Sequence, residues 1–308
     1  MTIQIFYKKF PLFYNFNGLS FVLITNFEIK FRGTMRLKTT LLLALLVAVF
    51  GTANSQGFNS VYSPDGVFVI AAGNQGKIFR STDGGASYSS FTVNASVNYK
   101  SCFVLDSTVW MAGSDGNVYR TPRHSMNPVG IGTGKASSIN SIYFVNKNTG
   151  YLCGDSGVAM RTTNGGNNWF NLNSGLALVN YNSVHFRDSV NGVVAGNSGI
   201  LYLTSDGGAT WTLQTTGTTR NLLKAKYFSD GIAVTGEYGT LLMKYGTSPW
   251  QTVSTRIDSD IRGIAGTGIY NARVCGGGGF IRNNSNGSTR FLNFEINPML
   301  GDLKDIYY

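Results

Sequence analysis

One four-residue pattern, Gly-x-x-Gly, constrains the fold of this chain more than any other feature. It occurs six times, and the first glycines of successive copies are 40, 41, 42, 40 and 40 residues apart. The pairs are Gly73/Gly76, Gly113/Gly116, Gly154/Gly157, Gly196/Gly199, Gly236/Gly239 and Gly276/Gly279. A nearly constant period of this length indicates one supersecondary unit copied along the chain. We therefore expect a repeat protein.

Each unit contains four short apolar segments separated by Asn, Asp, Ser or Gly. In the third unit these segments are residues 141–144, 150–154, 158–162 and 168–170. Such segments are typical of strands joined by tight hairpins. Four strands in about 40 residues match one blade of a β-propeller, because an isolated four-stranded sheet cannot bury both of its faces. We predict an all-β fold, a β-propeller of four-stranded antiparallel blades, with six complete blades and the first strand of a seventh.

The glycine pairs are interpreted as turn residues. Only two residues separate them, as in Asn74-Gln75, Asp155-Ser156 and Asn197-Ser198. A two-residue turn in a right-twisted hairpin needs positive φ, which Asn, Asp and Gly adopt at low cost. Gly-rich loops also hold phosphates, but such a loop precedes a helix, and here a strand follows every copy.

Two other positions of the unit are predicted to lie in the core. The residue before the first glycine is small in every copy, as expected where adjacent sheets approach closely: Ala72, Ala112, Cys153, Ala195, Thr235 and Cys275. One position of the first strand is apolar or small in every copy: Val61, Cys102, Ile142, Val184, Ala225, Ile264 and Ile306.

A second motif lies between the third and fourth strands of three units, at residues 81–88, 162–169 and 204–211, with a weaker copy at 284–291. Its Asp or Asn caps a turn, its two glycines take left-handed positions, and its aromatic residue anchors the fourth strand. Units two and five lack it, at residues 121–124 and 244–247. The residues given this structural role are Asp83, Gly84, Gly85, Asn164, Gly165, Gly166, Trp169, Asp206, Gly207, Gly208 and Trp211.

This second motif resembles the Asp-box, or BNR, repeat, and the whole unit resembles the repeat of the Ycf48/Hcf136-like propellers, a family named for a photosystem II assembly factor. The resemblance runs from about Gly57 to the end and rests on both motifs in register. It implies a propeller surface that docks unassembled membrane subunits. Similar repeats occur in many secreted bacterial proteins outside photosynthesis, so the resemblance leaves the kind of source organism open.

The first 55 residues differ from the repeats. Residues 35–38 begin a basic stretch, residues 41–50 are all apolar, and residues 53–55 are small or polar. This pattern is typical of a secretory signal peptide, and ten apolar residues are too few to span a bilayer. We expect a signal peptide at 35–55, a mature chain that starts near Gln56, and a periplasmic, cell-surface or extracellular location. Residues 1–34 are interpreted as a mis-assigned start, with Met35 as the true one, or as an unstructured extension.

The propeller is expected to occupy residues 56–308. Its blades are placed at about 57–95, 97–132, 138–174, 180–216, 220–254 and 259–293, with a partial blade at 302–308. Two explanations fit the partial blade. An open ring exposes a sheet edge, which favours a fragment of a longer protein with seven or more blades; alternatively, the last strand closes the ring by joining a neighbouring sheet.

Charge and composition limit the partners. The first 55 residues hold six Lys or Arg and one acidic residue, so the formal charge of +10 falls to +5 over the rest. This excess is a weak indication of an acidic partner, and no basic cluster interleaved with aromatics indicates nucleic acid. His124 and His185 lie in different units without other ligands at suitable spacing, so no metal or other cofactor is expected. The three cysteines fall at core positions and are interpreted as buried thiols.

A glycan-acting enzyme is the main alternative, because Asp-box repeats also occur in sialidases. A glycosidase needs two positioned carboxyl groups, or a Tyr–Glu pair, an acid and three arginines in sialidases. After residue 55 only Glu237 and Glu295 are glutamates, and Glu237 takes a hairpin position that other units fill with Asp155 or Asn197. We predict no catalytic residues and a non-enzymatic scaffold. An architectural module of a larger surface protein is a third possibility.

Three arginines recur in register, each four residues after the second glycine of its pair. They predict a stripe across three blades that could hold carboxylates or phosphates of a partner. The alternative is that each arginine covers its blade edge and pairs locally; Leu203 and Met243 interrupt the stripe. The candidate partner-binding residues are Arg80, Arg120, Arg161, Lys77, Glu237 and Tyr238. We expect a protein partner of unknown identity, and a monomer with no membrane span after signal cleavage.

Overall fold

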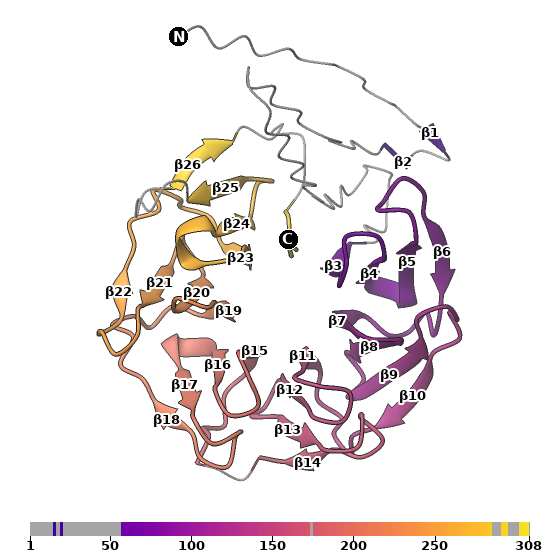
Figure 1. Cartoon of the computed structure of the whole chain (residues 1–308), viewed down its shortest axis with the longest axis horizontal. Coiled ribbons are helices and arrows are strands. Elements are labelled where there is room, and N and C mark those ends of the chain that lie inside the picture. The colour runs from indigo at the N-terminus through magenta and orange to yellow at the C-terminus, as the bar shows by residue number, and fades with distance from the viewer. Residues whose placement is uncertain are drawn as a thin grey trace, which may run out of the picture.

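The strands are arranged in blades around an axis (Figure 1). The computed structural model describes residues 15–16, 19–20, 57–172, 175–284, 291–294 and 302–307. Six four-stranded sheets follow one another along the chain, and in each the strands pair with their sequence neighbours. All pairings are antiparallel, as in β11 with β12 and β12 with β13. The predicted all-β propeller is confirmed.

Blade one contains β3 (Phe58–Tyr62), β4 (Val69–Gly73), β5 (Lys77–Ser81) and β6 (Ser89–Thr92). Blade two contains β7 (Tyr99–Leu105), β8 (Thr108–Gly113), β9 (Asn117–Pro122) and β10 (Val129–Gly132). Blade three contains β11 (Ile139–Phe144), β12 (Gly150–Gly154), β13 (Ala159–Thr162) and β14 (Phe170–Asn171).

Blade four contains β15 (Tyr181–Phe186), β16 (Gly192–Gly196), β17 (Leu201–Thr204) and β18 (Thr212–Leu213). Blade five contains β19 (Leu222–Tyr227), β20 (Ile232–Gly236), β21 (Leu241–Lys244) and β22 (Gln251–Thr252). Blade six contains β23 (Ile261–Ala265), β24 (Arg273–Gly276), β25 (Ile281–Asn284) and β26 (Phe291–Phe294), and a short pair, β1 (Asn15–Phe16) with β2 (Leu19–Ser20), precedes the blades.

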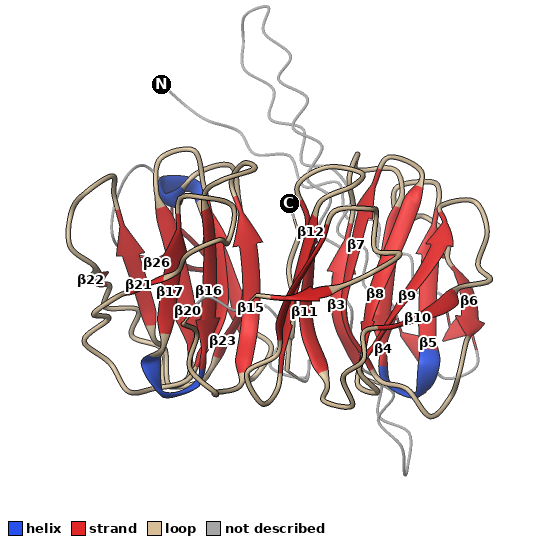
Figure 2. Ribbon diagram, turned by 90° about the horizontal axis from the view of Figure 1, so that it is seen from below, coloured by secondary structure: helices blue, strands red, loops and turns tan. Residues whose placement is uncertain are grey.

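The two faces of the disk carry different turns (Figure 2). The 3-10 turns η1 (Asn74–Gly76) and η2 (Asn197–Gly199) join second to third strands and lie on one face. The turn η3 (Ile269–Asn271) precedes a second strand and lies on the other. We call the first the hairpin face. The opposite face, which also carries the turns after the third strands, is called the Asp-box face.

Every predicted core position is buried. The small residues before the first glycines, from Ala72 to Cys275, are fully buried, and the first-strand positions from Val61 to Ile306 are at most 6% exposed. Five hydrophobic clusters join facing sheets. For example, Cys102 of blade two packs with Ile70 of blade one, and Ile142 of blade three packs with Phe103 of blade two. The three cysteines are free and buried, as predicted, and burial raises the pKa of the Cys102 thiol to about 12.

Serine side chains connect the innermost strands of neighbouring blades. Ser60 Oγ accepts the Cys102 N–H at 3.2 Å, and Ser141 Oγ accepts the Val184 N–H at 3.2 Å. The same bond runs from Ile142 N–H to Ser101 and from Ala225 N–H to Ser183. These hydroxyls satisfy amides at the inner strand edge, where no further strand follows. We call this series the serine ladder.

The hairpin turns differ from the prediction in one detail. Positive φ is adopted by the second glycine and, except at Asp115 of blade two, by the residue before it, such as Gln75 (55°) and Ser198 (57°). Asn74 and Asp155 were expected to supply it but do not. Their side chains instead accept hydrogen bonds at 2.8 Å from Asn59 and Asn140 of the innermost strands, which fixes the hairpins to those strands.

Residues 302–307 lie beside the axis, between blades six and one (Figure 1). The Leu303 N–H donates to the Gly276 carbonyl at 3.1 Å, and Ile306 packs with Cys275. Toward blade one, the Ser60 hydroxyl donates to Asp305 Oδ2 at 3.0 Å, and the ring of Tyr307 lies 4.4 Å from that of Tyr62. This is the position predicted for the first strand of a seventh blade.

The expected strand itself is not formed in residues 302–307. Within the described chain no second strand pairs with this segment, so side-chain contacts and the bond to Gly276 hold it. Gly263 of blade six permits its close approach, because a Cβ there would lie 3.0 Å from the Ile306 nitrogen.

An ion pair fixes the segment to blade five. Lys224 Nζ lies 3.0 Å from Asp305 Oδ1, and the two side chains are 32% and 8% exposed. Burial disfavours the Lys224 charge, but the Asp305 carboxylate outweighs this effect, so the pKa of Lys224 is raised. The pair therefore joins residues that lie 81 positions apart in the sequence.

We expect Asp305→Asn to lower the free energy of unfolding by about 1–3 kcal/mol, because it leaves a largely buried lysine without its carboxylate. Combining it with Lys224→Met removes both charges. The double variant should therefore lose less stability than the sum of the single variants, by at least about 0.5 kcal/mol. Urea unfolding monitored by circular dichroism measures these values.

The matched control is Asp258→Asn, since Asp258 is exposed on the loop before β23. It should change stability by less than about 0.5 kcal/mol. Strict additivity of Asp305→Asn and Lys224→Met would show that the two charges do not stabilise each other.

Candidate functional site

The Asp-box turns are closed by their own hydrogen bonds. In blade four, the Thr204 hydroxyl donates to Asp206 Oδ1 at 2.7 Å and accepts the Gly208 N–H at 2.9 Å. Asp206 also accepts the Thr210 N–H at 2.9 Å and the Thr210 hydroxyl at 2.6 Å. Gly207 and Gly208 have φ of 72° and 85°. The corresponding bonds in blades one and three involve Ser81, Asp83, Gly85 and Ser87, and Thr162, Asn164, Gly166 and Asn168.

The aromatic residue of each box packs into its blade. Trp169 and Trp211 are each 7% exposed, and their rings lie edge-on to Phe144 and Phe186 at 6.0 Å. Tyr88 holds the same position in blade one, where the Gly85 Cα faces its hydroxyl. The boxes therefore join strand ends to the core. The weaker copy at 284–291 lies largely outside the described residues.

The hydrogen bonds of the boxes lower the pKa values of their carboxylates. The Thr210 hydroxyl, the Thr210 amide and the Thr204 hydroxyl hold the pKa of Asp206 at about 2. In blade one, the Ser87 hydroxyl and amide and the Ser81 hydroxyl lower the pKa of Asp83 to about 2. Carboxylates stabilised in the ionised form are poor general acids at neutral pH.

Two of the three recurrent arginines reach the next blade. Arg80 Nη1 donates to the His124 carbonyl at 3.1 Å, and Arg120 Nη1 donates to the Gly165 carbonyl at 3.1 Å. The guanidinium of Arg161 lies 5.7 Å from the ring centre of Tyr151, and its Nε is buried without a hydrogen-bond partner. Arg80 and Arg120 thus bind turns of adjacent blades, whereas Arg161 contacts a ring of its own blade.

Of the three candidates on the hairpin face, two are held by neighbouring side chains. Lys77 Nζ donates to the Thr92 hydroxyl at 2.8 Å. Glu237 Oε1 accepts the Asn221 side-chain amide at 2.8 Å, and Oε2 accepts the Asn221 N–H at 3.3 Å. Both Glu237 oxygens are therefore bonded to Asn221 and hold the hairpin turn in place.

Tyr238, the third candidate, is 63% exposed. Arg220 Nη1 donates to the Tyr238 carbonyl at 2.8 Å, and its guanidinium lies 5.5 Å from the centre of the Tyr238 ring. Exposed Tyr and Arg side chains are enriched at binding energy hot spots. Arg220 was not among the predicted binding residues, because its role depends on Tyr238, 18 residues away, and no repeat pattern links the two.

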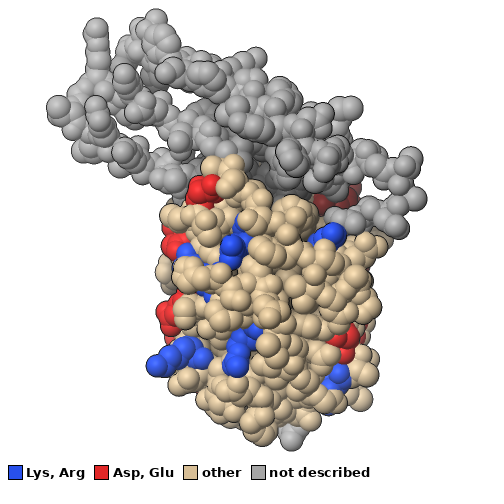
Figure 3. All heavy atoms as spheres, turned by 90° about the vertical axis from the view of Figure 1, so that its right-hand side faces the viewer, with Lys and Arg blue, Asp and Glu red and all other residues tan. Residues whose placement is uncertain are grey.

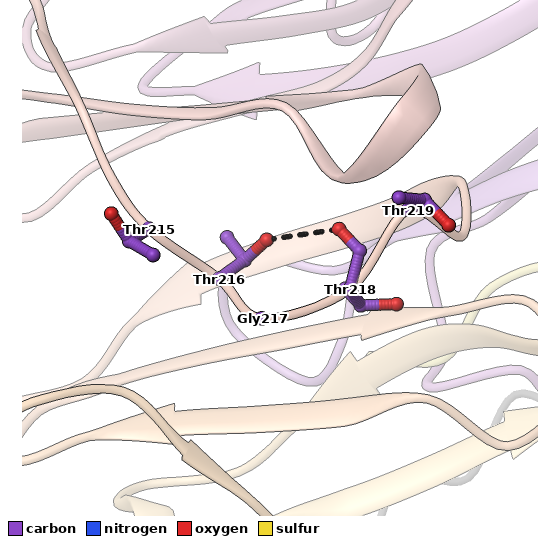
Figure 4. A pocket seen from close by; sticks show the side chains of 5 residues that line it. All are labelled: Thr215, Thr216, Gly217, Thr218 and Thr219. Carbon is purple, nitrogen blue, oxygen red and sulfur yellow. Dashed lines mark hydrogen bonds between the residues drawn. The ribbon is translucent and has the colours of Figure 1, made fainter.

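Residues 215–219, which directly precede Arg220 in the sequence, line an open hollow of about 520 Å³ (Figure 4). The Thr216 hydroxyl donates to the Gly199 carbonyl at 2.9 Å and to the Thr218 carbonyl at 3.3 Å. The lining consists of four threonines and Gly217. It offers hydroxyl groups for hydrogen bonding but no titratable group for acid–base catalysis.

Charged side chains are scattered among neutral ones on the side of the disk shown in Figure 3. Within the described residues, no three His, Cys, Asp or Glu side chains are grouped so that they could hold a metal ion. None of the helices in this part of the chain has the length and hydropathy needed to cross a membrane.

Comparison with known proteins identifies the class of this propeller. Residues 126–215 match the sequence model of the family described as photosynthesis system II assembly factor YCF48. YCF48 from Cyanidioschyzon merolae superposes with a TM-score of 0.66 at 15% identity, over 84% of this chain and 89% of that chain. YCF48 bound to D1 peptide gives 0.65 at 15% identity, over 81% of this chain and 91% of that one.

An enzyme is also among the structural neighbours. The GH74 enzyme of Niastella koreensis gives a TM-score of 0.64 at 14% identity, over 77% of this chain but only 45% of that chain. No curated protein matches the chain in sequence. The molecule is a β-propeller with Asp-box repeats. More particularly, its residues 126–215 are similar to the repeats of the YCF48 family, as the resemblance implied, and the two YCF48 structures share its propeller fold.

The lowered pKa of Asp206 predicts a pH-dependent effect of Asp206→Asn. Because the pKa in the folded protein, about 2, lies below the ordinary value of 3.8 for an aspartate, the carboxylate stabilises the fold above about pH 4. This stabilisation is lost as pH falls through 2. The variant should therefore have a lower Tm at pH 7, by no more than about 3 °C, and the difference should disappear near pH 2. Differential scanning calorimetry across this range measures it.

Asn164→Ala is the matched control, because it opens the blade-three turn without removing a charge. Its effect on Tm should be similar at pH 7 and pH 3. A deficit of Asp206→Asn that persists unchanged at pH 2 would rule out the carboxylate as its cause.

Proposed function

We propose that this protein is a non-enzymatic, protein-binding scaffold of the Ycf48 type, with the exposed Tyr238–Arg220 pair on the hairpin face as part of its partner surface. The exposure of Tyr238 carries the proposal: an aromatic ring that is 63% exposed and has an adjacent guanidinium provides apolar area, a cation and hydrogen-bond donors. The partner is proposed to be a polypeptide.

The hydrogen bonds and the ion pair that four carboxylates already make support a non-enzymatic role. Asp83 and Asp206 are bound within their turns, and both Glu237 oxygens are bound to Asn221. Asp260 lies 2.9 Å from Arg262. Retaining and inverting glycosidases need two carboxyl groups free to act on one glycosidic bond. These four carboxylates do not provide such a pair.

One of the similar solved structures supports a polypeptide partner. The YCF48 structure with a bound D1 peptide is that of a propeller of this kind holding a peptide. At 15% identity the likeness extends to the fold, so the identity of the partner here is open. The GH74 neighbour is matched over less than half of its own chain and likewise supports the fold alone.

Export is part of the proposal. It rests on residues 35–55, whose basic start, apolar run and small residues are typical of a signal peptide. We expect a product that starts near Gln56 outside the cytoplasm. Cell fractionation followed by intact-mass spectrometry tests this, and a cytoplasmic product that retains residues 35–55 would contradict it.

Site-specific photo-crosslinking tests the partner surface. A benzophenone amino acid at position 238 is expected to give a defined adduct, whereas the same group at exposed position 82 on the Asp-box face is not. The captured protein is then purified and titrated. We expect Tyr238→Ala to raise its Kd by about tenfold or more, and Arg220→Ala to raise it less. Thr82→Ala should leave it unchanged.

The hydrolase alternative has its own test. A panel of 4-methylumbelliferyl glycosides should release no fluorophore in the presence of the purified protein. Hydrolysis that Glu237→Gln abolishes would overturn the proposed function, as would identical crosslinking from positions 82 and 238.

A further inference from the structure

Aromatic side chains follow one another around the axis. They occupy the same position of successive innermost strands, two residues after the serine of the ladder. Neighbouring rings are 4.4, 4.7, 4.9 and 4.5 Å apart between centroids. The members of this aromatic arc are Tyr307, Tyr62, Phe103, Tyr143 and His185. Together they form an apolar wall with polar tips.

Lys226 takes this position in blade five, and Ala265 takes it in blade six. The Lys226 Nζ lies 5.3 Å from the ring centre of Phe228. Among the described residues no carboxylate pairs with it, since Asp305, the acidic group on the neighbouring segment, is bound to Lys224. The arc therefore ends beside a cation that has an aromatic face as its contact but no counter-charge.

The other polar groups at this level are hydrogen-bond donors. His185 Nδ1 accepts the Tyr227 N–H at 3.3 Å, so a neutral imidazole carries its proton on Nε2. Burial, then the charges of Lys226 and Lys224, lower the pKa of His185 to about 3, which keeps it neutral. Burial raises the pKa of Tyr143 to about 12 and that of Tyr62 further, so both phenols stay protonated at neutral pH.

We propose that these groups form a binding site for a carboxylate, which we call the axial donor site: Tyr62, Tyr143, His185, Lys226 and Tyr307. A single carboxylate supplies the negative charge that Lys226 lacks, and its two oxygens accept the ammonium and nearby O–H or N–H donors. The aromatic arc contacts the apolar part of the ligand. The carboxylate belongs to a small organic acid or to the C-terminus of a peptide. This site is separate from the hairpin-face surface and does not depend on the proposed function.

The site has one uncompensated cation, Lys226, and this favours a carboxylate over a phosphate as its ligand. Lys224 and Asp305 neutralise each other at 3.0 Å, so Lys226 provides the uncompensated positive charge. A phosphate dianion is usually bound by several cations or by a guanidinium fork. The axial donor site has a single ammonium and neutral donors, which suits a monoanion.

Protonation of Lys226 predicts how binding depends on pH. Burial, then the charge of Lys224, lower the pKa of Lys226 to about 8, an effect that Asp305 partly offsets. Of the other titratable groups of the site, His185, Tyr62 and Tyr143 stay neutral between pH 6 and 9, because the pKa of His185 is lowered and those of the two phenols are raised. Affinity for a carboxylate should therefore be highest below pH 8 and fall as pH rises through that value.

The test uses benzoate and its neutral analogue benzamide, titrated into the whole protein by isothermal calorimetry at pH 6.5. Benzoate should bind, and benzamide should bind at least about tenfold more weakly. Lys226→Met should weaken benzoate binding by about tenfold or more, whereas Lys226→Arg should retain it. Lys226→Met should keep or raise the Tm, because it removes a largely buried cation without a partner. That result separates a binding role from a structural one.

Peptide arms distinguish the two sources of the carboxylate. An Ala-rich hexapeptide with a free C-terminus that binds, while its amidated form does not, would assign the site to chain termini; binding of benzoate alone would assign it to small acids. Either result supports the site. No binding of benzoate or peptide, equal binding of benzamide, tighter binding of phosphate, unchanged affinity of Lys226→Met, or a Tm lost with that variant would overturn it.

Discussion

The rest of the structure depends on how the inner edge of each blade is satisfied. No further strand can pair with an innermost strand on its axial side, so its amides need other acceptors. Serine hydroxyls supply them, each one accepting an N–H from the next blade, as Ser60 does from Cys102 and Ser101 from Ile142. A short side chain sets a short distance between strands. The buried small residues and close sheet packing follow from this spacing.

In the segment 302–307 a charged residue replaces the serine of the ladder, and a lysine neutralises its charge. Asp305 stands where other blades have serine, and its Oδ2 lies 3.3 Å from the Val61 N–H. A carboxylate at 8% exposure needs a counter-charge. Lys224, which replaces the serine of blade five, provides it at 3.0 Å. Two departures from the repeat thus compensate each other across blade six, where Gly263 contributes no side chain.

Much of the fold could be predicted from the sequence, and less of the site. Glycine spacing and the small residue before each first glycine depend on local geometry that every unit repeats, so the blades and their core were predictable. The Tyr238–Arg220 contact joins two different loops, and no repeated sequence pattern indicates it. The members of the aromatic arc hold equivalent positions of successive units, from Tyr62 to Tyr307, but only the packing of blades around the axis brings their rings together. For Arg80 and Arg120 the sequence left two interpretations open, a partner-binding stripe and local pairing at the blade edge.

The bridging asparagines have a mechanical consequence. Asn59 donates both to its own hairpin, at Asn74, and to the Tyr99 carbonyl of the next blade, and Asn182 does the same toward Leu222. Lys100, Leu223 and Arg262 replace these asparagines in blades two, five and six, and blades five and six also lack the serines. The hydrogen bonds between inner strands are therefore distributed unevenly: serine hydroxyls join blades one to five in series, and this series stops before blade six. We therefore expect blade six to move against its neighbours more easily than the other blades do.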